Sequence, residues 1–181
     1  MRIIILITLF TAFLSLRSQH VAKIDESLVN PDIKVMISSD LSFPDLKIQY
    51  GLYLNDPDIT VFIGQKIEKS NLIITKSDLA DQRILCGEEI ENPDIKILAR
   101  SDLKYADFRI SFVNEPNADC DVYFNETLNF NRVLAALLPI MDSHYSLHNY
   151  FESHPVISDL KNKLGIKSWK RNRYIDIDEL E

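Results

Sequence analysis

The sequence predicts a mainly β protein: an eight-strand repeat meander that forms a sandwich or barrel, followed by short C-terminal helices. Three observations predict it. Aspartates recur at a spacing close to thirteen residues, apolar residues alternate after each of them, and the composition becomes helical after residue 127.

Residues 1–18 have the character of a secretory signal peptide. One basic residue, Arg2, precedes an apolar run from Ile3 to Leu16. That run is shorter than the roughly 20 residues of a transmembrane helix and is typical of a signal sequence. We expect cleavage after Ser18, with an uncleaved membrane anchor as the alternative. Residues 19–30 are then expected to be a linker.

A tandem β-repeat domain is predicted over residues 31–127. Each repeat begins with an anchor residue preceded by Pro, Ala or Ser; the anchors are Asp32, Asp45, Asp58, Asn71, Asp81, Asp94, Asp107 and Asp119. Apolar residues then alternate with polar ones, as in Ile33, Val35 and Ile37. Period-two alternation with β-branched residues is typical of a half-buried strand.

Two arrangements fit a strand every thirteen residues. A coil in which each repeat makes a full turn has a narrow bore, and close-packed interiors do not admit overfilling. Tyr50, Phe108 and Phe112 are too large for such a bore. The sequence therefore favours an up-and-down meander.

Cys86 and Cys120 are the two cysteines of the chain, and both have the inward phase of their strands. Export would make them candidates for a disulfide. A meander brings both to the same end of the sheet, whereas inward cysteines at opposite ends would argue against it. The alternative is two buried thiols that never meet.

Residues 128–181 are predicted to form a helical C-terminal segment with a charged tail. Helices are expected over 132–138, ending at Pro139, and over 155–164. We expect them to cover the open end of the β domain.

The histidines of this segment are the candidate metal ligands. His144 and His148 are four residues apart, with Glu152 nearby. On a helix this spacing places them on one face, as a zinc site requires. The alternative is surface or capping histidines, and we predict no cofactor.

Outward strand positions carry more apolar residues than a fully wetted face needs. Phe62, Leu98 and Tyr123 are the candidate interaction surface. Coverage of this face by the C-terminal helices would explain the same pattern.

The net charge of −7 limits the possible partners. Without residues 1–18 the chain keeps 18 basic and 27 acidic residues, a net charge of −9. Nucleic acid is therefore not expected as a partner, and a membrane is expected only if the N-terminal segment is uncleaved. The partner expected from these exclusions is a protein or a glycan.

Two repeats, Ala106-Asp107-Phe108-Arg109-Ile110-Ser111-Phe112 and Asn92-Pro93-Asp94-Ile95-Lys96-Ile97, carry a family resemblance. They resemble the tandem Ala-Asp-x-x-Val strand repeats of small exported bacterial proteins of unknown function, over roughly residues 31–126. Four repeats depart from that pattern by using Pro in place of Ala. The resemblance implies a secreted or periplasmic location in the bacterial cell envelope and no particular activity.

The sequence thus predicts an exported, non-enzymatic binding or structural module. The alternatives are a metal-dependent hydrolase centred on His144 and His148, and a secreted effector.

Overall fold

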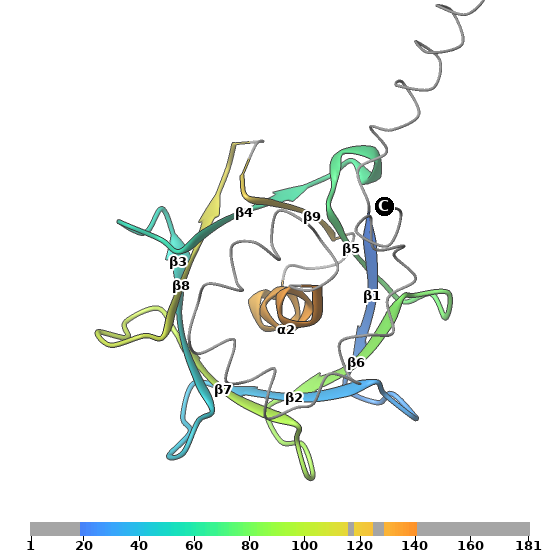
Figure 1. Cartoon of the computed structure of the whole chain (residues 1–181), viewed down its shortest axis with the longest axis horizontal. Helices are drawn as coiled ribbons and strands as arrows, with labels where there is room; N and C mark the ends of the chain where they lie inside the picture. Colours follow the sequence, from blue (N-terminus) through green and yellow to red (C-terminus); the bar gives the residue numbers. More distant parts are fainter. Residues whose placement is uncertain (1–18, 116–117, 125–128, 141–181) are drawn as a thin grey trace, which may run out of the picture.

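The computed structural model describes residues 19–115, 118–124 and 129–140. These residues form a closed barrel of parallel strands around one α-helix (Figure 1). The elements are β1 (His20–Asp25), β2 (Ile33–Ser38), β3 (Leu46–Leu52), β4 (Ile59–Gly64), η1 (Ile67–Lys69), β5 (Leu72–Thr75), β6 (Gln82–Gly87), β7 (Ile95–Arg100), β8 (Phe108–Val113), β9 (Cys120–Phe124) and α2 (Phe130–Ile140).

The chain passes around the barrel twice. The strand order in the ring is β1-β5-β9-β4-β8-β3-β7-β2-β6, and β6 pairs back to β1. Each strand therefore lies two places along the ring from the next strand in the chain. The second pass fills the gaps left by the first, so that β6 pairs with β1 through its first half and with β2 through its second half.

This topology corrects the predicted meander. The mainly β character is confirmed, but the strands are parallel and number nine within the described residues. A coil with one repeat per turn would have too narrow a bore for Tyr50, Phe108 and Phe112. The chain instead spreads nine strands over two turns, so the bore is wide enough for large side chains and for a helix.

The additional strand lies in the segment expected to be a linker. Residues 19–30 contain β1, whose inward residues His20, Ala22 and Ile24 are buried. It lacks an Asp at its start, and the repeat pattern therefore missed it. It is nevertheless paired on both edges, with β5 and β6.

Helix α2 fills the interior of the barrel. Residues 133–138 are consecutive and all buried, which places every face of this part of the helix against protein (Figure 1). The helix starts at Asn129, whose side-chain oxygen accepts the Arg132 N–H at 3.2 Å. Phe130 packs on Phe112 and Tyr50, with ring centroids 4.5 and 5.6 Å apart.

The helix predicted over 132–138 is thus confirmed and is longer, and Pro139 lies inside it. It occupies the core of the barrel instead of covering an open end. The second predicted helix, over 155–164, and the charged tail lie outside the described residues.

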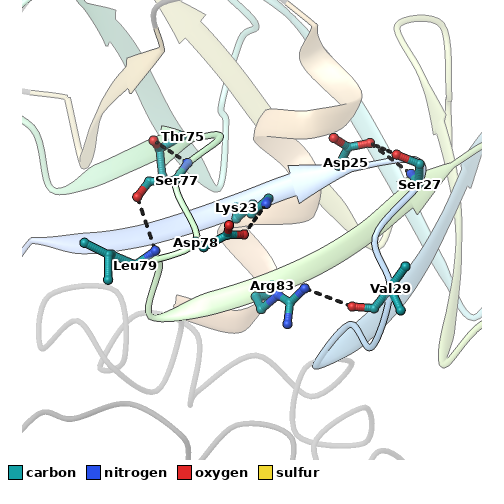
Figure 2. A network of polar contacts seen from close by, with 9 residues as sticks. All are labelled: Lys23, Asp25, Ser27, Val29, Thr75, Ser77, Asp78, Leu79 and Arg83. Carbon is teal, nitrogen blue, oxygen red and sulfur yellow. Dashed lines mark hydrogen bonds and ion pairs between the residues drawn. The ribbon is translucent and has the colours of Figure 1, made fainter.

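The described connections between successive strands run outside the barrel wall, each across the strand that it skips. Arg83 on β6 donates to the carbonyl of Val29 in the β1–β2 connection, and Lys23 on β1 pairs with Asp78 in the β5–β6 connection (Figure 2). Gln49 on β3 likewise donates to the carbonyl of Ser101 in the β7–β8 connection. The connections thus form an outer layer that half-covers the outward side chains of the strands.

The anchor residues bind this coil together. The backbone N–H of Asp81 donates to the carbonyl of Val21, and the Val21 N–H donates to the Asp81 carboxylate, at 2.8 and 2.9 Å. The same two-bond clamp joins six of the other seven anchors to a strand residue of the other pass: Asp32 to Arg83, Asp45 to Lys96, Asp58 to Arg109, Asn71 to Asp121, Asp94 to Lys34 and Asp107 to Lys47.

Asp119 completes the set with a variation. Its carboxylate accepts both the N–H and the hydroxyl of Thr60, and its own N–H donates to that hydroxyl. Every anchor side chain therefore supplies the acceptor oxygen that a strand residue needs where the neighbouring chain turns outward. This explains why Asp recurs in the repeat and why Asn serves at position 71.

Replacing Asp81 with Ala should lower the free energy of unfolding by about 1–3 kcal/mol, because the half-buried Val21 N–H loses its acceptor. Asp81→Asn keeps an acceptor oxygen, as Asn71 does naturally, and should stay within about 0.5 kcal/mol of the parent. Urea unfolding followed by circular dichroism measures both. Equal losses in the two variants, or no loss in either, would contradict the clamp.

Candidate functional site

The predicted metal ligands His144, His148 and Glu152 lie outside the described residues. Within the described part of the chain, no group of three or more His, Cys, Asp or Glu side chains is placed to hold a metal ion. The cysteines and the outer surface are the remaining candidates within the described residues.

Cys86 and Cys120 are both free and buried. Cys86 lies near the end of β6 and Cys120 at the start of β9, so in a parallel barrel they lie toward opposite ends of the wall. In the ring β6 and β9 are separated by β1 and β5. Three strand spacings are about 14 Å, twice the roughly 7 Å that a disulfide spans between Cα atoms.

The environment of both thiols keeps them protonated. Burial raises the pKa of Cys86 to about 12, and burial together with the carboxylates of Asp121 and Asp119 raises the pKa of Cys120 further. The Cys86 thiol donates to the carbonyl of Asn131 in the first turn of α2, at 3.9 Å. A thiol becomes a nucleophile when its pKa falls toward neutrality, which is the opposite of this arrangement.

We expect both cysteines to resist alkylation by iodoacetamide at pH 7.5 in the folded protein and to react fully in urea without any reductant. Mass spectrometry of the intact protein counts the added groups. Rapid labelling of the folded protein would contradict the burial. A mass lower by two hydrogens, with no labelling in urea, would indicate a disulfide.

The predicted interaction surface is divided and half-covered. Phe62 on β4 and Tyr123 on the adjacent β9 are close in register, since Tyr123 pairs with Gly64. Phe62 lies against Gly64, where an added Cβ would be 3.1 Å from the phenyl ring. Leu98 is on β7, separated from β4 by β3 and β8. All three side chains are half-buried, so these positions do not form one open patch.

The most exposed large apolar side chains are instead on the connections. The order of the connections around the barrel follows the order of the strands they cross, and Figure 1 shows them projecting outward in that order. Three neighbouring connections, 39–45, 101–107 and 53–58, cross β7, β3 and β8. They carry Phe43 and Tyr105, each 87% exposed, and Tyr53, 58% exposed. We call these three residues the aromatic sector.

A second group of exposed residues lies elsewhere on the ring. Val29, Leu79 and Ile67 are exposed on the connections that cross β6, β1 and β9; we call them the aliphatic sector. Connection 88–94, with Glu88, Glu89 and Glu91, lies between the two sectors on one side (Figure 1). The exposed apolar residues of the connections therefore fall into one aromatic group and one aliphatic group.

The aromatic sector contains a groove of about 570 Å³. It is lined by Gln49, Asp102, Leu103, Lys104, Tyr105, Ala106 and Arg109. These residues come from the outer faces of β3 and β8 and from the connection that crosses β3. Tyr105 stands at this groove with its ring almost fully exposed.

Hydrogen bonds hold the polar residues of the groove in place. The Gln49 amide nitrogen donates to the Ser101 carbonyl at 3.1 Å, and its oxygen accepts from Arg109 Nε at 3.1 Å. A terminal nitrogen of Arg109 donates to the Asp56 carbonyl at 3.0 Å. Gln49 and Arg109 are therefore oriented before any ligand arrives.

Cations outnumber carboxylates by two to one among the residues that line the groove. The guanidinium of Arg100 makes two hydrogen bonds to Asp102, at 2.8 and 2.7 Å, and lowers the pKa of that carboxyl. Asp102 is thus ionised and paired with Arg100 at the surface. Lys104 and Arg109 add two cations to a surface of an otherwise acidic chain.

No family model, curated protein or solved structure matches this chain.

The sequence contained one signal for this site. Phe43, Tyr53 and Tyr105 interrupt connections that are otherwise rich in Ser, Asp, Asn and Pro. A large aromatic residue in a polar loop is unusual because exposing its ring is costly. The outward strand positions lie on the half-covered wall, whereas these three aromatic residues lie in loops outside the alternating pattern.

Proposed function

We propose that this protein is an exported, non-enzymatic binding module of the bacterial cell envelope that contacts a protein or glycan partner through its aromatic sector. The observation that carries the proposal is the presence of Phe43, Tyr53 and Tyr105, each more than half exposed, on three neighbouring connections.

Exposure of these rings is a reason to expect a partner. Burying a large aromatic side chain contributes roughly 1.5–3 kcal/mol, which is not gained while the ring stays in water. Tyr is among the residues that most often dominate binding energy in interfaces. The interior of the barrel is occupied by α2, so the outer surface is the place for recognition.

The ionisable groups support a binding role. Surface pairs with Lys23 and Arg100 lower the carboxyl pKa values of Asp78 and Asp102. The buried thiols have raised pKa values. None of these has the partly buried, charge-coupled setting typical of a catalytic acid or base. The hydrolase and effector alternatives depend on residues outside the described ranges.

The position of β1 is compatible with export. The wall begins at His20, two residues after the predicted cleavage site. Cleavage after Ser18 therefore keeps the whole barrel, whereas a cut inside β1 would remove a strand paired on both edges. None of the helices in the described ranges has the length and apolar character needed to span a membrane.

The test compares two matched variants. We expect Phe43→Ser/Tyr105→Ser to lose at least ten-fold in binding to the envelope fraction of the producing cells, because two exposed anchors are removed. Val29→Ser/Leu79→Ser removes a similar number of exposed apolar groups from the aliphatic sector and should bind like the parent. Sedimentation with washed envelopes measures both.

Equal binding by the parent and the aromatic-sector variant would refute the proposal, as would absence of envelope binding by the parent. Urea unfolding of all three proteins serves as the control, because these exposed side chains should contribute little to stability.

A further inference from the structure

We infer that the groove beside Tyr105 binds an acidic saccharide, that is, an oligosaccharide bearing carboxylates. The inference rests on the proposed binding function and names the class of partner for that surface. Three features of the groove support it: an exposed ring, a pair of oriented planar polar groups, and a local excess of positive charge.

The exposed ring supplies the apolar contact. The C–H face of a pyranose sugar is apolar and nearly flat, and it matches the face of an aromatic side chain. Tyr105 is 87% exposed beside the groove and carries a hydroxyl that can bond at the edge of the ring. An aliphatic side chain would offer neither the flat face nor the polar edge.

The oriented polar groups supply the hydrogen bonds. Sugars present hydroxyls in adjacent pairs, which planar amide and guanidinium groups can bridge. Gln49 and Arg109 are bonded to each other at 3.1 Å and anchored to the carbonyls of Ser101 and Asp56. Because their geometry is set in advance, less conformational entropy is lost on binding.

The charge selects an acidic ligand. Lys104 and Arg109 line the groove, while the Asp102 carboxylate is paired with Arg100 through two hydrogen bonds. Arg presents donors that fit a carboxylate. The acidic connection 88–94, with Glu88, Glu89 and Glu91, is separated from connection 101–107 by 39–45 in the ring, so its carboxylates are not in the groove.

The size and the overall charge narrow the ligand further. A volume of about 570 Å³ lies within the range of small-ligand sites, roughly 300–1,000 Å³. A nucleic acid would also present anions, but the net charge of −7 repels a long polyanion. A short oligosaccharide of acidic sugars contacts only the groove, where Lys104 and Arg109 lie.

The experiment uses isothermal titration calorimetry with uronic-acid and sialic-acid oligosaccharides, each beside its neutral counterpart. We expect at least one acidic oligosaccharide to bind at least ten-fold more tightly than its neutral counterpart. Tyr105→Ala should weaken that binding about ten-fold or more. Lys104→Ala should reduce the preference for the acidic form. Leu79→Ala removes a 91% exposed side chain of the aliphatic sector and should change nothing.

The inference is overturned if no acidic oligosaccharide binds at millimolar concentration, if neutral and acidic forms bind equally, or if Tyr105→Ala binds like the parent. Envelope binding that depends on Phe43 and Tyr105, combined with no oligosaccharide binding, would leave the proposed function standing with a protein partner. If neither envelope binding nor oligosaccharide binding is observed, the proposed function and this inference are both refuted. Circular dichroism of each variant checks that it is folded.

Discussion

The architecture depends on the hydrogen bonding of two interleaved passes of the chain. Among the nine described strands, none pairs with its neighbour in sequence; partners are about fifty or sixty residues away, as in Ile33 with Ile84 and Ala22 with Gln82. Each Asp anchor hydrogen-bonds a residue equally distant in sequence, and so completes the strand pairing where the chain turns outward. An unpaired half-buried backbone group is costly, so neither pass is satisfied without the other.

Closure of this wall determines where the other parts can lie. It encloses a bore that α2 fills, where Leu134 and Leu137 are buried and Phe130 reaches Phe112. The described connections between strands cross the outside, where they half-cover the outward strand residues and present their own side chains to solvent (Figure 1). The proposed recognition surface therefore lies on the connections, and the strands order them around the ring.

Much of the local structure was predictable from the sequence. The alternation at Ile33, Val35 and Ile37 was correct in phase, and the helix over 132–138 was correct in place. The direction of the strands was not predictable, because a period of two indicates which face of a strand is buried but not which strand it pairs with. Parallel pairs usually need a long crossover. Here a six-residue strand spans only about 16 Å, and an extended seven-residue connection reaches about 24 Å. A connection of that length can therefore run back to the start of the next parallel strand. The site escaped prediction because Phe43 and Tyr105 are in loops, outside any periodic pattern.

Cross-linking of cysteine pairs tests the interleaved topology most directly. In a Cys86→Ala/Cys120→Ala background, Lys47→Cys and Leu98→Cys occupy paired outward positions on β3 and β7. Met36→Cys and Gln49→Cys lie on β2 and β3, which a meander would make neighbours but which β7 separates in the barrel. Oxidation and mass spectrometry should find a disulfide in the first pair and none in the second. A disulfide between positions 36 and 49, without one between 47 and 98, would contradict the two-pass parallel barrel.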